Sequence, residues 1–110
     1  MPQEKKLTDV HVHLDQYAPE EIGPVLKRAD EAGVRWIVTT GFDLGTSASA
    51  VEIAVAFEQV LASVGIHPHD AETCSESTLK QFRRLARHPN IRAWGEIGLD
   101  FNRMYSPRAD

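Results

Sequence analysis

Apolar and polar positions along this chain follow two alternating periods. Short apolar runs rich in β-branched residues predict four strands, and helical spacing of apolar residues predicts a helix after each of the first three. The expected strands cover roughly residues 7–13, 34–40, 60–66 and 91–97, and the expected helices begin near Pro19, 45 and 76. This order is typical of βαβ units, which form a parallel sheet with right-handed crossovers.

The first expected helix has one clear apolar face and defined ends. Pro24 is expected in its first turn, because a proline ring breaks a helix interior. Gly33 is expected as the residue that ends the helix. The apolar face comprises residues at helical spacing, namely Ile22, Val25, Leu26 and Ala29.

The other two helices are expected over roughly 45–57 and 76–87. Thr46 or Ser47 is the candidate N-cap of the second helix. Its expected buried residues are Leu44, Ala48, Val51 and Val55, and those of the third helix are Leu79, Phe82, Leu85 and Ala86. The strand over 34–40 is a compact apolar run, so it is expected to be buried.

Residues capable of chemistry lie where three of the four strands end. The first strand ends at His11 and His13, the third at His67 and His69, and the fourth at Glu96, followed by Asp100. Functional groups of parallel α/β folds collect at the carboxyl ends of the strands. The sequence therefore predicts that these stretches converge on one rim of the sheet.

The pair His11 and His13 is the first candidate for metal binding. Side chains alternate along a strand, so both imidazoles should point to the same face. Two imidazoles with the carboxylate of Glu96 suit Zn²⁺, Mn²⁺, Fe²⁺ or Ni²⁺, and such an ion can polarise a phosphoryl or carbonyl oxygen. The competing interpretations are a solvated polar pair on a strand edge and a Glu96 that pairs with an arginine.

The remaining histidines and the cysteine have less specific settings. His67 or His69 could bind a substrate phosphate or orient water, although His69 could equally be a plain surface residue. His88 precedes a proline at a helix end and is expected to be structural. Cys74 has no neighbouring thiol or imidazole at ligand spacing, so it is interpreted as an incidental loop residue.

Composition and charge limit the class of protein. The chain has 110 residues with 42% hydrophobic and 25% charged residues, which fits a single globular domain over 1–110. A net charge of −4 excludes a broad basic surface, so a phosphate substrate would need a local device such as a metal ion. The cationic side of the third helix is interpreted as a solvated face. It comprises Lys80, Arg83, Arg84 and Arg87.

The expected location is the cytoplasm. A single cysteine excludes an internal disulfide framework and is compatible with a reducing compartment. No apolar run approaches the length of a membrane span. The polar first six residues lead straight into the first strand, so no signal peptide is expected.

Several motifs resemble those of the TatD-type metal-dependent deoxyribonucleases, a family of TIM barrels in the amidohydrolase superfamily. The matching segments are DVHVHLD at 9–15, GIHPH at 65–69, GEIGLDF at 95–101 and YSPR at 105–108. The resemblance implies that His11 and His13 are metal ligands, that Glu96 is a catalytic carboxylate shared by two metal ions, and that His67 binds near the substrate phosphate. It further implies hydrolysis of DNA phosphodiester bonds, often at single-stranded 3′ ends, with Mg²⁺, Mn²⁺ or Zn²⁺.

The resemblance covers the amino-terminal half of the family's barrel. A TIM barrel needs eight strand–helix units in about 250 residues, and this chain supplies four strands. The family's further ligands, two histidines on strands five and six and an aspartate on strand eight, have no counterpart. The expectation is therefore a truncated half barrel whose open edge favours self-association. The alternatives are a non-catalytic remnant or association module that binds metal weakly, and a related hydrolase of amides or lactones.

Overall fold

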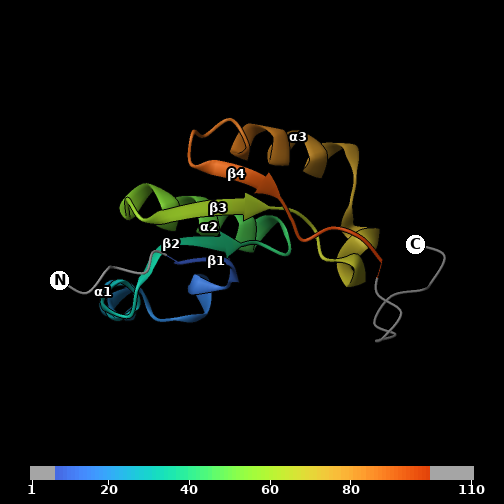
Figure 1. Cartoon of the computed structure of the whole chain (residues 1–110). Helices are drawn as coiled ribbons and strands as arrows, with labels where there is room; N and C mark the ends of the chain where they lie inside the picture. The colour runs from blue at the N-terminus through green and yellow to red at the C-terminus, as the bar shows by residue number, and fades with distance from the viewer. Residues whose placement is uncertain (1–6, 100–110) are drawn as a thin grey trace.

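The computed structural model of this chain describes residues 7–99 and has four parallel strands in the order β1-β2-β3-β4 (Figure 1). The strands are β1 (Leu7–Val12), β2 (Val34–Thr40), β3 (Val60–Val64) and β4 (Ile91–Trp94). The helices are α1 (Pro19–Glu31), α2 (Leu44–Ala56) and α3 (Glu76–Leu85), with short 3₁₀ helices η1 (Leu14–Gln16) and η2 (Pro68–Thr73). The predicted βαβ architecture is confirmed. Asp100, Phe101 and the motif at 105–108 lie outside the described residues.

The fourth strand is shorter than the sequence predicts. It ends at Trp94, so Glu96 lies just beyond the strand instead of within it. The backbone leaves the sheet here because its hydrogen bonds change partner. Gly95 N–H still donates to the carbonyl of Val64 in β3, but Glu96 N–H donates to the carbonyl of Gly41 beyond β2. The third strand likewise ends at Val64, two residues early.

Helix α1 has the predicted apolar face but a different position for its internal proline. Pro19 already occupies the first turn, so Pro24 falls in the second turn and the expected placement is wrong. The N–H that Pro24 lacks would have bonded to the carbonyl of Glu20, four residues earlier. Glu20 is exposed, so water can satisfy that carbonyl. Gly33 follows the helix with φ of 96°, a conformation that favours glycine, as expected.

Helix α2 begins earlier than predicted and buries a different face. Its N-cap is Asp43, whose carboxylate accepts from the backbone of Thr46 in a capping box, so neither Thr46 nor Ser47 is the cap. Buried Ser47 hydrogen-bonds to both the N–H and the carbonyl of Gly65. These bonds turn small residues toward β3 and leave Val55 59% exposed. The buried residues of α2 are Ser47, Ala50 and Ala54.

Helix α3 is anchored mainly by one aromatic side chain. Its N-cap Ser75 forms a capping box with Thr78, and Phe82 is buried with 2% exposure. Leu79 is 41% exposed, contrary to prediction, because it borders an open apolar hollow instead of packing under another element. The cationic residues of α3 are exposed, which agrees with a solvated face.

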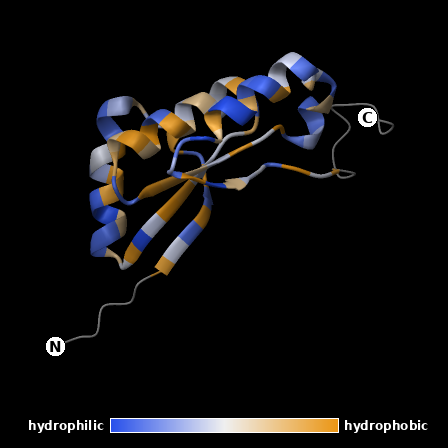
Figure 2. Ribbon diagram, turned by 90° about the horizontal axis from the view of Figure 1, so that it is seen from above, coloured by the Kyte–Doolittle hydropathy of each residue, from blue (hydrophilic) through white to orange (hydrophobic). Residues whose placement is uncertain are grey.

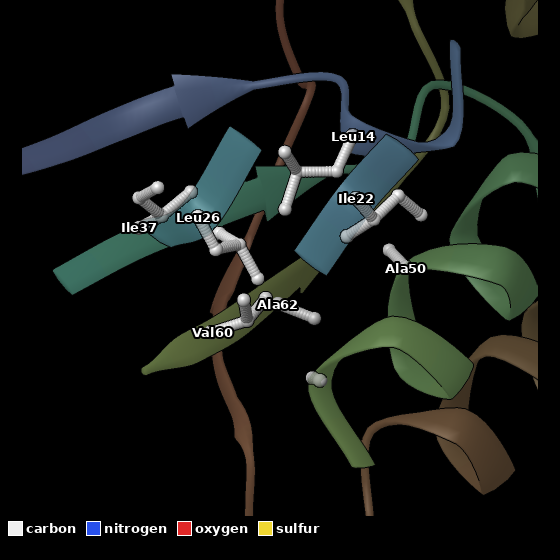
Figure 3. Close-up of a cluster of buried hydrophobic side chains, with 8 residues drawn as sticks. Leu14, Ile22, Leu26, Ile37, Ala50, Val60 and Ala62 are labelled. Carbon is white, nitrogen blue, oxygen red and sulfur yellow. The ribbon is translucent and has the colours of Figure 1, made fainter. Parts of the chain in front are cut away.

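The hydrophobic core lies between the sheet and helices α1 and α2 (Figure 3). It comprises Leu14, Ile22, Leu26, Ile37, Ala50, Ala54, Val60 and Ala62. Figure 2 shows the helices along one side of the strands. The first half of β2 is less buried than predicted, since Trp36 is 38% exposed and only Ile37, Thr39 and Thr40 are buried. Among residues 7–99, no helix has the length and apolarity needed to cross a membrane.

Candidate metal centre

The carboxylate of Glu96 lies among three histidine side chains at the carboxyl edge of the sheet. Its oxygens are 3.9 Å from Nε2 of His11, 3.9 Å from Nε2 of His13 and 3.7 Å from Nε2 of His67. These residues lie on β1, directly after β1 and after β3, so the predicted convergence of the clusters is confirmed. The ion pairs of Glu96 within residues 7–99 are with these histidines, and none of the arginines described there pairs with it.

A backbone hydrogen bond fixes the orientation and tautomer of His13. Its Nδ1 lies 2.8 Å from the carbonyl oxygen of Thr40 at the end of β2. A carbonyl can only accept, so Nδ1 carries the hydrogen and donates it. In the neutral ring, Nε2 then has a free lone pair, and that atom faces Glu96. Histidines that bind metals are commonly held in this way by a second hydrogen bond from the other ring nitrogen.

His67 is held in the opposite tautomer. Its Nδ1 accepts a hydrogen bond of 3.1 Å from the backbone N–H of His69. In the neutral ring, Nε2 therefore carries the hydrogen and points it toward Glu96. This Nε2 is a hydrogen-bond donor and has no lone pair for a metal ion, so His67 and His13 differ in what they can do chemically.

The other histidines have separate environments. The ring of His69 stacks on His67 with centroids 4.9 Å apart, so His69 belongs to the rim and is not a plain surface residue. His11 is the most open member of the site, with a side chain that is 54% exposed, and its ring packs edge-on against His13. His88 accepts a hydrogen bond from the N–H of Asn90 and closes the turn after α3, which agrees with a structural role.

The position of Glu96 depends on a glycine that sequence reasoning did not single out. A Cβ atom added to Gly65 would lie 2.6 Å from the carbonyl carbon of Gly95 and 2.7 Å from the carbonyl oxygen of Glu96. Only glycine therefore lets the segment that carries Glu96 pass so close to the end of β3. The sequence signal was present, since Gly65 is the first residue of the motif at 65–69, but nothing in the sequence identifies the segment that it contacts.

The donor set can hold one divalent ion if the side chains move inward. One ligand atom from each of His11, His13 and Glu96 lies within 4.8 Å of the other two. Two atoms that each bind an ion at about 2.1 Å can be at most about 4.2 Å apart. The nitrogen–oxygen distances of 3.9 Å meet this limit. Three ligands at tetrahedral angles lie about 3.4 Å apart, so the full set would close onto an ion after the side chains move inward by about 1 Å, which exposed His11 can supply.

Comparisons with known proteins agree with this geometry. The family model described as "TatD related DNase" matches residues 8–110. The chain is 38% identical over 90 residues to the 3'-5' ssDNA/RNA exonuclease TatD of Edwardsiella piscicida, covering 81% of this chain and 35% of that protein. It is 36% identical over 104 residues to the uncharacterized metal-dependent hydrolase YabD of Bacillus subtilis, covering 93% of this chain and 40% of that protein.

Solved structures show the same relationship. The crystal structure of YJJV, a TatD homolog from Escherichia coli K12, superposes with a TM-score of 0.79 at 29% identity, over 93% of this chain and 40% of that chain. A hydrolase TatD family protein from Entamoeba histolytica gives a TM-score of 0.83 at 25% identity, over 97% of this chain and 42% of that chain. The chain thus spans about two fifths of the length of these structures.

The fold defines an α/β protein built as about four βα units of a (β/α)₈ barrel, with a cluster of His11, His13 and Glu96 at the carboxyl rim of its sheet. Within this class the chain belongs to the TatD related DNase family, whose model matches nearly all of it.

Proposed function

We propose that this chain carries the amino-terminal part of a metal-dependent phosphodiesterase site that acts on single-stranded DNA or RNA. His11, His13 and Glu96 would hold a divalent ion, and His67 would contact a substrate phosphate. The observation that carries the proposal is the pair of opposite tautomers around Glu96. His13 presents a lone pair to the site, whereas His67 presents a hydrogen.

The two tautomers would give the histidines different roles at a phosphodiester, ion binding for His13 and hydrogen-bond donation for His67. A divalent ion such as Mg²⁺, Mn²⁺ or Zn²⁺ supplies Lewis-acid polarisation of a phosphoryl oxygen and makes water more acidic. The Nε2–H of His67 can donate to a non-bridging oxygen and stabilise the negative charge that develops there. Glu96 is 3.9 Å or less from each histidine, so it can neutralise either ring once that ring is charged.

The substrate assignment rests on chemistry and on the relatives. The Edwardsiella relative is named a 3'-5' exonuclease of single-stranded DNA and RNA, so attack at 3′ ends is part of the proposal. The chain has a net charge of −4, so phosphate binding would depend on the ion and on His67 rather than on general attraction. A cytoplasmic location is also proposed, and the single cysteine, Cys74, is compatible with it.

A second candidate, an association module, is favoured by one observation. Strands β1 and β4 each have a neighbour on one side only within residues 7–99. Open strand edges pair readily with other chains. The exposed Val10 and Ile97, at 68% and 74% exposure, would be covered by such a contact.

Titration calorimetry with Mn²⁺ and a cleavage assay on a 5′-labelled single strand test the proposal. The purified chain should bind Mn²⁺ and cleave slowly, because three ligands leave a second ion only the shared carboxylate and water. Glu96→Gln keeps the shape and removes the charge, so it should lose both properties. Mn²⁺ binding that Glu96→Gln leaves intact would refute the site, and binding without any cleavage would favour the association module.

A further inference from the structure

We propose that Tyr17, with Gln16, forms a binding site for the nucleobase next to the phosphate that is cleaved. This inference rests on the proposed function, because it names the part of the substrate that the segment after β1 receives. Both residues line a hollow of about 360 Å³ whose other walls are Val12 and His13. One wall of this hollow is thus a member of the candidate metal centre.

The hollow suits a base in size and in chemistry. Its volume lies at the lower end of the range of about 300–1,000 Å³ that is usual for small-molecule sites. Tyr17 is 42% exposed, so packing alone does not account for its aromatic ring at this position. Aromatic rings stack on every base, and the side-chain amide of Gln16 offers both a donor and acceptor to a base edge. Such a site would accept different bases, as an exonuclease requires.

The backbone holds Tyr17 in place. Its N–H donates to the carbonyl of Leu14 at 3.1 Å, and Gln16 N–H donates to the carbonyl of His13 at 3.2 Å. Leu14 is fully buried in the core, and its N–H donates to the Oγ1 of buried Thr39. The segment is therefore attached to the core at Leu14 and to the metal centre at His13. A rigid aromatic ring loses little entropy when it binds a base.

Tyr17 borders two hollows, and the negative charge of one of them indicates which would receive the substrate. Tyr17 also borders a second hollow of about 320 Å³, whose lining includes Asp15 and Glu52. No described residue hydrogen-bonds to the buried Oδ1 of Asp15, so no described donor offsets the acidic lining that Asp15 and Glu52 give this hollow. Carboxylates repel phosphates, so the nucleic-acid substrate would lie in the hollow lined by His13 and not in the one lined by Asp15 and Glu52.

The test compares two single strands, one with a normal 3′-terminal nucleotide and one in which this nucleotide is abasic. A phosphorothioate at the last linkage slows cleavage, and fluorescence anisotropy with Mn²⁺ gives the affinities. The unaltered chain should prefer the base-bearing strand about tenfold, the scale of one stacked base. Tyr17→Leu should abolish this preference, and Tyr17→Phe should keep it.

Trp36→Leu is the matched control. Trp36 is also a partly exposed aromatic residue, but it lies four residues before Thr40, about 13 Å from the rim along β2. Its removal should leave the preference intact. An unaltered chain that binds both strands equally, or a Tyr17→Leu variant that keeps the preference, would overturn the inference alone. An unaltered chain with no Mn²⁺-dependent binding of either strand would overturn the proposed function as well.

Discussion

The carbonyl oxygen of Thr40 accepts a hydrogen bond from Nδ1 of His13, 27 positions earlier in the chain. Because β1 and β2 are parallel neighbours, the end of β2 lies beside the residue that follows β1. This single contact sets the tautomer of His13 and turns its Nε2 toward Glu96. A backbone carbonyl of the sheet therefore determines which nitrogen of His13 is available to a metal ion.

The two histidines of the first motif should differ in their effect on stability. His11→Ala and His13→Ala should each weaken Mn²⁺ binding at least tenfold. Removing a residue that only hydrogen-bonds to a metal ligand already lowers metal affinity by about tenfold or more. His13→Ala should also lower the free energy of unfolding by about 0.5–1.5 kcal/mol, because its bond to Thr40 is lost. His11 is largely exposed, so its removal should change stability by less than about 0.5 kcal/mol.

Calorimetry for Mn²⁺ and urea unfolding of the metal-free chain measure these two effects. His88→Ala is the control for metal binding, since His88 only closes a turn by accepting from Asn90. Equal Mn²⁺ affinity in the His13→Ala variant and the unaltered chain would remove His13 from the site.

His67 should affect catalysis without affecting metal affinity. His67→Ala removes a donor of the kind that stabilises developing charge, and loss of one such donor costs about 100- to 1,000-fold in kcat. Mn²⁺ affinity should stay within about twofold, because Nε2 of His67 has no lone pair for the ion in the tautomer that His69 fixes. A large loss of Mn²⁺ affinity in this variant would make His67 a ligand instead.

Gly65→Ala should displace Glu96. The new methyl group would meet the backbone of Gly95 at 2.6 Å, which no side-chain movement relieves. We expect a loss of about 1–3 kcal/mol in unfolding free energy, as in other overpacked sites, together with weaker Mn²⁺ binding.

Gly45→Ala is the matched control for this change. Gly45 lies in the first turn of α2, and the nearest atom outside its chain neighbours and its own helix backbone that a methyl group there meets is Oδ1 of Asp43, at an ordinary contact distance of 3.8 Å. This variant should keep its Mn²⁺ affinity and raise the free energy of unfolding by about 0.4–1 kcal/mol, because alanine loses less backbone freedom than glycine on folding. A Gly65→Ala variant with unchanged stability and affinity would show that Gly65 does not position Glu96.

The purified 110-residue chain should self-associate. The open edges of β1 and β4 and the exposed side chains of Val10 and Ile97 favour contact with a second copy. Light scattering should give a mass that rises with concentration, and Val10→Lys combined with Ile97→Lys should shift it toward the monomer. A single monomeric mass for the unaltered chain at all concentrations would contradict this prediction.

The sequence by itself determined the order of elements and which candidate site residues meet at one rim. Local rules suffice for these features, because apolar runs specify strands and parallel strands bring their carboxyl ends to one rim. His11, His13, His67 and Glu96 could be named for that reason, and the TatD-type motifs agreed with them. The same rules failed where a residue's partner is distant in sequence. Ser47 faces Gly65 and so rotates α2 away from the predicted face of Leu44, Ala48, Val51 and Val55.

Only the tertiary structure decided the chemistry of each histidine. A histidine in a sequence can bind through either ring nitrogen, and its tautomer depends on which backbone group it meets. The bond to Thr40 leaves a lone pair on Nε2 of neutral His13, and the bond from His69 leaves a hydrogen on Nε2 of neutral His67. The first contact spans 27 positions and exists only because two parallel strands lie side by side. The requirement for glycine at position 65 likewise comes from the backbone of Gly95 and Glu96, which no local sequence pattern places beside it.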